Sequence, residues 1–220
     1  MKTSSGTSLT ENPSPGMDTS LEFYWYPGQD ANIAPAIADD ILEAHPEYGL
    51  LYTWAAASGR TDHKEEETNN STQQQYQGIC PTSWHLPSDY EWNQLEKEIA
   101  ESAAGIYSIS DAATWETSYS DQRDAVRGTH GQKMKSTTAV NIQDNDGTSK
   151  SHSDGGFDAL LVSVIMDDSA LNYGTTTAFW SSSSFDRTTA WRRNVYYDIA
   201  GVYRNPSYRV HMRSVRCKKN

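Results

Sequence analysis

The residues that most constrain the fold are Ser88 and Glu91, which form a capping box within residues 86–92. In this motif each side chain accepts a hydrogen bond from a backbone N–H that the first turn of a helix leaves unpaired. We therefore predict that a helix begins here. Apolar residues at positions i, i+3 and i+7 give it one buried stripe, while its charged residues face the solvent. The stripe comprises Trp92, Leu95 and Ile99, and the predicted outward residues are Glu96, Lys97, Glu98 and Glu101.

A β-hairpin is predicted near the C-terminus. Strands at residues 189–197 and 202–205 flank a turn through Asp198-Ile199-Ala200-Gly201, and Pro206 is expected to interrupt the second strand. A helix followed by a mainly β section predicts the α+β class, with short twisted antiparallel sheets, one or two helices and long loops.

The remaining elements have weaker signals. Apolar runs predict buried strands at residues 50–54 and 157–162, and isoleucines spaced four apart predict a short helix at 33–44. The length of 220 residues fits one domain. Because residues 1–20 are rich in Ser, Thr, Pro and Gly, we expect them to form a flexible tail on a single domain at 21–220.

Charge is distributed unevenly along the chain. The formal net charge of −11 disfavours nucleic acid as a partner. No run approaches the roughly 20 apolar residues that cross a bilayer, so we expect no membrane insertion. Residues 181–213, in contrast, hold six Arg and two acidic residues, a local charge of +4. This segment can meet an acidic partner even though the chain as a whole is acidic.

The same segment is rich in aromatic residues, with Ser, Thr and Asn between them. Tyr and Trp give large contact areas at low entropic cost, Arg donates forked hydrogen bonds, and Asn adapts, so the composition is typical of binding surfaces. An ordinary antiparallel sheet also favours Tyr and Thr, and this alternative remains open. The predicted ligand-binding residues are Phe185, Arg187, Trp191, Arg192, Arg193, Tyr196, Asp198, Tyr203, Arg204, Asn205, Tyr208, Arg209 and His211.

No catalytic centre is marked by the sequence. No carboxylate pair, nucleophile elbow or His-rich metal motif has the necessary spacing, so we expect a protein that is not an enzyme and needs no cofactor. His85, beside the helix start, is expected to be structural. Asp144 and Asp146 are weak candidates for calcium ligands, but their segment lacks the EF-hand spacing and fits an Asx-Gly turn better.

The chain has two cysteines, Cys80 and Cys217. They can form one disulfide or remain two buried thiols, and they cannot make a Cys-based zinc site alone. A bond closing so long a loop would stabilise the fold by about 5 kcal/mol on the chain-entropy model. Because the N-terminus has no apolar run, we expect either a mature fragment without its signal peptide or a protein not exported by that route.

Several motifs occur together in an order that resembles a known family. They are Gly49-Leu50-Leu51-Tyr52-Thr53-Trp54-Ala55-Ala56-Ala57, Gly78-Ile79-Cys80-Pro81, Trp84-His85-Leu86-Pro87-Ser88 with Glu91-Trp92, Phe179-Trp180-Ser181-Ser182, Ala190-Trp191 and Ser214-Val215-Arg216-Cys217. Over about residues 49–217 the chain resembles the Fibrobacter succinogenes major paralogous domain. That family occurs in surface and secreted proteins, often lipoproteins, of Bacteroidetes and Fibrobacter.

The resemblance implies a C-type lectin-like fold, in the branch that includes the formylglycine-generating enzyme. In that fold a cysteine near the first helix commonly pairs with one in the last strand, which implies a bond between Cys80 and Cys217. The activity of that enzyme is not implied, because it uses a cysteine pair of its own and no further cysteine exists in this chain. The Glu-Pro-Asn and Gln-Pro-Asp motifs of calcium-dependent sugar binding are also missing.

The chain also resembles variable proteins diversified by retroelements, which use lectin-like folds too. Adenine-directed variation of an Asn codon never produces Lys, Glu, Gln, Met or Trp. Of these residue types, residues 181–213 contain only Trp191 and Met212, as fixed scaffold positions would allow. Strands disfavour Lys and Glu in any case, so the composition leaves both explanations open.

We therefore expect an adhesin-like module that binds a protein or glycan on another cell or surface through residues 181–213. It would lie outside the cell or at the cell surface, with a phage particle as the alternative location, and a homo-oligomer is compatible with the sequence. The alternative functions are a structural or assembly domain of a surface protein, and a carbohydrate-active enzyme that uses a carboxylate pair.

Overall fold

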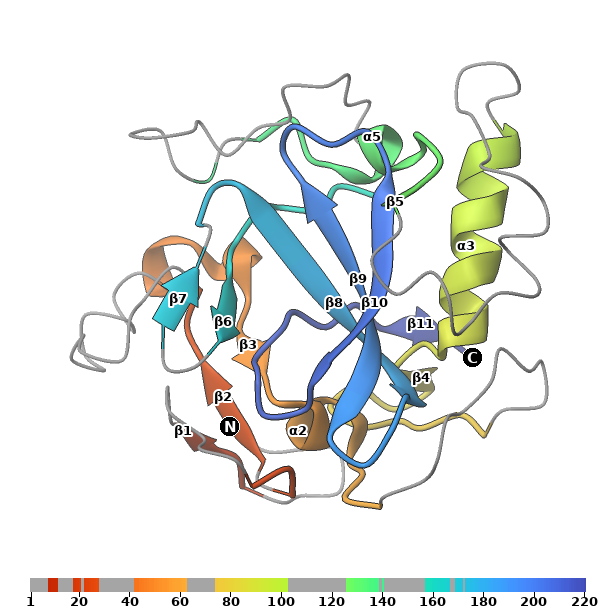
Figure 1. The fold of residues 1–220 in the computed structure, drawn as a ribbon. Helices are drawn as coiled ribbons and strands as arrows, with labels where there is room; N and C mark the ends of the chain where they lie inside the picture. Colours follow the sequence, from red (N-terminus) through yellow and green to blue (C-terminus); the bar gives the residue numbers. More distant parts are fainter. Residues whose placement is uncertain are drawn as a thin grey trace.

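A four-stranded antiparallel sheet organises the fold (Figure 1). Its strand order is β5-β10-β9-β8, formed by Val126–Arg127, Val202–Tyr208, Thr189–Tyr196 and Thr176–Ser184. We call it the central sheet. The structure is a computed structural model, and it describes residues 8–11, 18–20, 22–27, 42–62, 74–102, 126–138, 140, 157–166, 169–171 and 173–220.

Helix α3, Asp89–Ser102, packs against this sheet and begins where the capping box predicts. The backbone N–H of Ser88 donates to Glu91 Oε2 at 2.9 Å, and that of Glu91 donates to Ser88 Oγ at 3.2 Å. The Glu91 carboxylate also lies 2.9 Å from Nε2 of His85, which is buried. The predicted helix start is confirmed, and His85 supports it structurally.

Strands β9 and β10 form the predicted hairpin, with Tyr203 opposite Asn194. Pro206 does not interrupt β10, contrary to the sequence prediction, but lies within the strand opposite Trp191. Strand β5 pairs with β10 only at Val202 and Tyr203. At Pro206, therefore, the missing N–H removes no hydrogen bond to β5.

A second layer covers the β8 side of the central sheet. It contains the small sheet β1-β2-β3 and helix α2, formed by Thr10–Glu11, Phe23–Trp25, Leu51–Tyr52 and Trp54–Ser58. Two indole hydrogen bonds join this layer to β8. Trp54 Nε1 donates to Ser181 O at 2.9 Å, and Trp180 Nε1 donates to Tyr52 O at 2.8 Å. Each large side chain is thus held by a directional bond as well as by packing.

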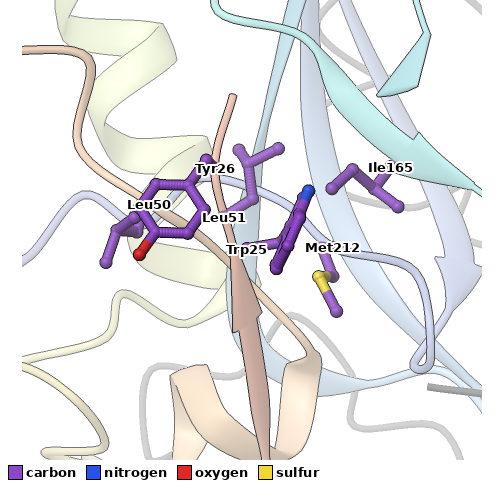
Figure 2. Packing of buried hydrophobic residues seen from close by; sticks show 6 residues of the cluster. All are labelled: Trp25, Tyr26, Leu50, Leu51, Ile165 and Met212. Atoms are coloured by element: carbon purple, nitrogen blue, oxygen red, sulfur yellow. The ribbon is translucent and has the colours of Figure 1, made fainter. Parts of the chain in front are cut away.

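One hydrophobic cluster of this layer is centred on Trp25 (Figure 2). Leu51 and Tyr26 lie on one side of its ring, and Ile165 and Met212 lie on the other. These side chains come from β2 and the residue after it, from β3, from β6 (Val164–Met166) and from the C-terminal segment. Burial of apolar surface here therefore holds together segments that are far apart in the sequence.

Two predicted strands differ from the observed structure. Strand β3 is limited to Leu51–Tyr52, because Thr53 turns the chain and the alanine-rich segment that follows forms α2. Residues 157–162 form no strand: Asp158 has φ of 58°, a left-handed conformation that breaks an extended run. Of the helix predicted at 33–44, only residues 42–44 are described, and these are helical.

The segment predicted to be a tail is attached to the domain where it is described. Strand β1 pairs in parallel with β2, Thr10 opposite Phe23 and Glu11 opposite Tyr24. Leu9 is buried. Residues 8–11 therefore belong to the folded unit.

The other elements are short. They are η1 (Pro46–Tyr48), β4 (Trp84–His85), α5 (Gly131–Met134), β6 (Val164–Met166), β7 (Ser169–Leu171) and β11 (Lys218–Lys219), with β4 paired to β11 and β6 to β7. Small, mainly antiparallel sheets with few helices confirm the α+β class. In the described ranges, no helix is long and apolar enough to cross a bilayer.

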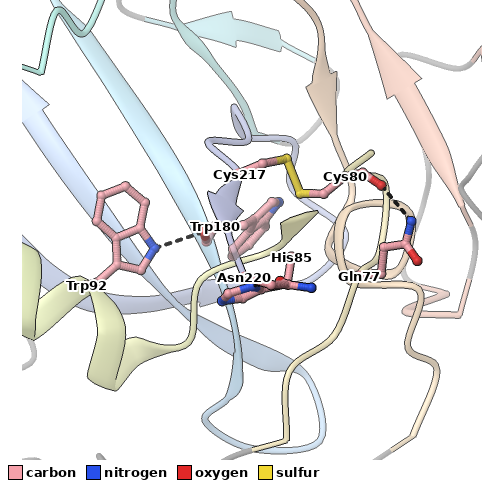
Figure 3. Close-up of a disulfide and its surroundings, with 7 residues drawn as sticks. All are labelled: Gln77, Cys80, His85, Trp92, Trp180, Cys217 and Asn220. Atoms are coloured by element: carbon pink, nitrogen blue, oxygen red, sulfur yellow. Dashed lines mark hydrogen bonds between the residues drawn. A yellow bond between two sulfur atoms is a disulfide. The ribbon is translucent and has the colours of Figure 1, made fainter. Parts of the chain in front are cut away.

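A disulfide joins Cys80 to Cys217, with an S–S distance of 2.04 Å and Cα atoms 5.8 Å apart (Figure 3). It lies in a cluster that includes Trp180. The indole of Trp92 donates to the carbonyl oxygen of Trp180 at 3.3 Å, so α3 and β8 meet close to the disulfide. Of the two alternatives left open by the sequence, the disulfide is confirmed.

Loss of the disulfide is expected to destabilise the domain. Reduction, or the double substitution C80S/C217S, should lower the free energy of unfolding by about 2–5 kcal/mol, because the cross-link restricts the unfolded chain. Urea unfolding with and without a reductant measures the effect. The C80S/C217S variant is the control, since its midpoint should not respond to reductant. Equal midpoints for the oxidised and reduced natural chain would contradict the prediction.

Candidate functional site on the outer face of the central sheet

The two faces of the central sheet have different surroundings. Side chains alternate along a strand, so neighbouring residues of β9 point to opposite sides. Arg193 points toward α3, on the side that we call inner, whereas Arg192 and Tyr196 point to the outer side. Cross-strand partners share a face, so Arg204 joins Arg193 and Asn205 joins Arg192.

On the inner side, six side chains form a buried ion network. They are Asp89, Glu96, Arg127, His130, Arg193 and Arg204, none of them more than 5% exposed. Arg193 Nη1 donates to Asp89 Oδ1 at 2.6 Å, and Arg204 Nη2 donates to Asp89 Oδ2 at 2.7 Å. Glu96 accepts hydrogen bonds from Arg127 and Arg193, and lies 3.0 Å from His130 Nε2. Two carboxylates of α3 thus hold arginines from β5, β9 and β10.

These contacts keep both carboxyl groups of α3 ionised. Burial opposes ionisation, but the charges of Arg193 and Arg204 hold the pKa of Asp89 well below its ordinary value. Burial opposes the ionisation of Glu96 as well, and Arg127 and Arg193 nevertheless lower its pKa to about 2. Both carboxylates are therefore ionised throughout the neutral range.

Glu96 corrects the predicted orientation of the helix. It was expected to face the solvent, yet it is fully buried, on the same side of α3 as Asp89 and Asn93. The physical reason is that its partners lie outside the helix, so the helix pattern alone cannot reveal them. The surface of residues 181–213 therefore carries less positive charge than the sequence suggests, because Arg193 and Arg204 are buried and paired with carboxylates.

Three further predicted binding residues also lie in the interior. Trp191, Arg209 and His211 are buried. The Arg204 guanidinium lies 3.8 Å from the centre of the Trp191 ring, and Arg209 Nη2 donates to Asp186 O at 2.7 Å. A buried side chain with internal partners cannot reach an external ligand. We therefore remove these three residues, and the two predicted arginines of the network, from the candidate surface.

Four predicted residues come together on the outer side of the sheet. Arg192, Tyr196, Tyr203 and Asn205 are each partly exposed. The Tyr196 and Tyr203 rings meet edge to face with centres 5.3 Å apart, and Asn205 lies opposite Arg192. Val126, which the sequence did not single out, lies opposite Tyr203 and is 40% exposed. We call these five residues the outer face.

A buried cation lies close to the outer face. Arg213 donates to Ile165 O, Met212 O and Ser207 Oγ, each at 2.9 Å, and within the described ranges it pairs with no carboxylate. Burial, and then the charge of Arg192, hold the pKa of Arg213 well below its usual value. Positive charge is therefore concentrated around Arg192.

The remaining predicted binding residues lie at the two ends of the hairpin. Arg187 and Tyr208 are exposed near one end, and Asp198 is exposed in the turn at the other. Phe185 is partly buried and packs edge to face against Trp191, with ring centres 4.9 Å apart. The structure does not bring these residues together with the outer face.

The weak calcium candidates, Asp144 and Asp146, lie outside the described residues. In the part of the chain that the structure describes, no group of three or more His, Cys, Asp or Glu side chains can hold a metal ion. The calcium hypothesis at these two positions stays a prediction.

A comparison with protein families accounts for the ordered motifs of the sequence. The model of the Fibrobacter succinogenes major domain matches residues 3–219. The chain belongs to this family. The match for this Fibrobacter succinogenes major domain extends beyond the resemblance at about 49–217 and includes strand β1. No curated protein and no solved structure matches the chain significantly.

Substitution Glu96→Gln is expected to destabilise this Fibrobacter succinogenes major domain strongly. It leaves buried guanidinium groups without a counter-charge, which costs about 3–5 kcal/mol in comparable cases. Chemical denaturation measures the loss. Glu98→Gln, an exposed substitution on the same helix, is the matched control and should change stability by less than about 0.5 kcal/mol. Equal effects of the two substitutions would contradict a stabilising role for the network.

Acid should unfold the domain through the same carboxylates. The pKa values of Asp89 and Glu96 are lower in the folded state than the roughly 4 of unfolded chains. Their contribution to stability is therefore complete above about pH 4 and is lost as the pH falls toward 2. Denaturation midpoints measured from pH 7 to pH 2 test this. A midpoint that stays constant across the acidic range would disprove the assignment.

Proposed function

We propose that this domain is a non-enzymatic module that binds a protein or glycan through the outer face. The supporting observation is that neighbouring residues of the β9–β10 hairpin point to opposite sides of the sheet and have different surroundings. Arg193 and Arg204 fasten the sheet to α3, whereas Arg192 and Asn205, their neighbours in sequence, are partly exposed on the other side. The exposed set lies on the side of the hairpin that faces away from α3, where a partner can reach it.

The chemistry of the outer face suits recognition. Two tyrosine rings, an arginine and an asparagine lie on adjacent strands, and these residue types are enriched in binding surfaces. The charge of Arg192, with buried Arg213 nearby, favours a partner with acidic groups. We therefore still propose an acidic partner, but one that contacts the outer face and not all of residues 181–213.

The scaffold beneath the outer face is held by ionic contacts and a disulfide. The buried ion network fixes β9 and β10 to α3, and the Cys80–Cys217 disulfide closes the domain near its C-terminal end. Holding contact residues in place before binding reduces the entropic cost of association. Such a scaffold supports a binding role better than one that needs large movements.

A carbohydrate-active enzyme receives less support. A general acid in such an enzyme needs a raised pKa. Glu47 and Glu91 each line a cavity among the described residues, and both have lowered pKa values. Hydrogen bonds from its own backbone and from His45 lower the pKa of Glu47. Partial burial opposes the ionisation of Glu91, but hydrogen bonds from Lys218 and the Ser88 N–H lower its pKa.

A structural or assembly role predicts a different use of the same surface. In that case copies of the chain would bury the outer face in a homo-oligomer. Analytical ultracentrifugation of the natural chain and of an outer-face variant separates the two roles, because only the assembly role predicts a change in molecular mass.

We also propose a C-type lectin-like scaffold and a location outside the cell or at its surface. The disulfide joins the segment before α3 to the last segment of the chain, as it does in that fold. Disulfides persist in oxidising compartments, which supports an extracellular location.

Retroelement diversification is proposed only for the outward positions. Arg193, Arg204, Arg209 and Arg213 have fixed internal partners, so variation there would damage the fold. The coding DNA tests this. A neighbouring, nearly identical repeat that differs at adenines in outward codons supports the proposal, and a locus without any such repeat rejects it.

Removal of the outer-face side chains is expected to abolish binding and leave the fold intact. The variant R192A/Y196A/Y203A/N205A should lose at least about tenfold in affinity, because these are the candidate anchor residues. The assay presents arrayed glycans and extracted cell-surface proteins to the labelled domain. The control carries Gln94→Ala, Glu98→Ala and Glu101→Ala on the exposed side of α3. Equal binding by both variants, or binding by neither the natural chain nor its variants, would refute the proposal.

A further inference from the structure

A cavity of about 510 Å³ lies beside β8, apart from the outer face. None of its lining residues belongs to the outer face, and its volume lies within the range of about 300–1,000 Å³ that is usual for small-molecule sites. We propose that this cavity is a second binding site, and that it accepts a neutral saccharide. This inference does not depend on the function proposed for the outer face.

The floor of the cavity is fixed by β8 and the segment paired to it. Phe179 of β8 forms a parallel bridge with Ser214, whose N–H donates to Ala178 O at 2.9 Å. The hydroxyl oxygens of Ser214 and Thr177 lie 3.5 Å apart. These side chains are buried, so they fix the shape of this part of the cavity.

The walls are mainly apolar and aromatic. Tyr48, Tyr52, Leu160 and Val162 are among the lining residues. His45 stacks on one face of the Tyr48 ring, with centres 4.7 Å apart and planes 5° from parallel, which restricts the orientation of the ring. Aromatic and aliphatic surfaces of this kind pack against the C–H faces of a sugar ring.

Charged groups complete the lining. Glu47 and Asp158 supply carboxylates, and Arg216 supplies a guanidinium that is held by its hydrogen bond to Phe157 O at 3.2 Å and by its contact with the Phe157 ring. A carboxylate only accepts hydrogen bonds and a guanidinium only donates them, whereas a sugar hydroxyl does both. Vicinal hydroxyl groups therefore match this set, and two carboxylates against one guanidinium disfavour an anionic ligand.

The backbone directs two parts of the lining. Asp158 has φ of 58° and Gly49 has φ of 65°, both in the left-handed region. Asn tolerates this conformation nearly as well as Asp does. Asp158→Asn therefore removes one carboxylate without a backbone penalty, which makes it a suitable test variant.

The test titrates the isotope-labelled full chain with cellobiose, lactose and N,N′-diacetylchitobiose, each followed by amide NMR. We expect at least one of these probes to cause saturable shifts at the amides of Gly49, Leu160 and Ser214. Asp158→Asn and Tyr48→Ala should each weaken that probe by about tenfold, as the loss of one charge-assisted hydrogen bond or one ring contact predicts. Asp198→Asn, an exposed substitution in the β9–β10 turn, is the matched control and should bind as the natural chain does.

Three outcomes would overturn the proposal. One is the absence of saturable shifts with every neutral probe at millimolar concentration. Another is saturable binding of glucuronate, an anionic sugar titrated in the same way, without binding of any neutral probe. That result would indicate an anion site. The third is an equal affinity of Asp158→Asn and the natural chain. The R192A/Y196A/Y203A/N205A variant should retain saccharide binding at the cavity, so failure of the outer-face proposal and failure of this one are distinguishable.

Discussion

Two carboxylates on one face of α3 determine how the central sheet is placed. Taking ions out of water costs several kcal/mol each, so Asp89 and Glu96 are stable in the interior only when their arginine partners are also in place. Those partners come from β5, β9 and β10, which lie far from α3 in the sequence. The helix and three strands must therefore assemble in one register, and an incomplete network would leave buried charge uncompensated.

The other side of the sheet is held by different forces. There, the second layer packs Trp54 and Trp180 against β8, with indole hydrogen bonds to carbonyl oxygens. Because ionic contacts fix one side of the hairpin and aromatic packing covers β8, the outer side of β9 and β10 is left partly open. The candidate surface is therefore the part of the sheet that neither α3 nor the second layer covers. The proposed saccharide cavity lies where the second layer meets the edge of β8.

Local signals in the sequence predicted local structure well. The capping box located the start of α3, and turn residues located the β9–β10 hairpin, because both depend on residues a few positions apart. The burial of Glu96 was not predictable in this way, since its partners lie about 30 and 100 residues away. For the same reason the sequence revealed four residues of the outer face but assigned Arg193 and Arg204 to it as well. The cavity could not be predicted from the sequence, because five segments that are separate in the sequence line it.

Three contacts attach residues 217–220 to the rest of the domain. Strand β11 pairs with β4, the N–H of Asn220 donates to Ser83 O at 3.0 Å, and Cys217 is bonded covalently to Cys80. A pulling force applied at residue 220 would therefore meet a covalent bond after only three residues, and hydrogen bonds alone would not carry the load. The force would pass directly to the segment that precedes α3. While the disulfide is intact, the C-terminal strand therefore cannot be peeled away beyond Cys217.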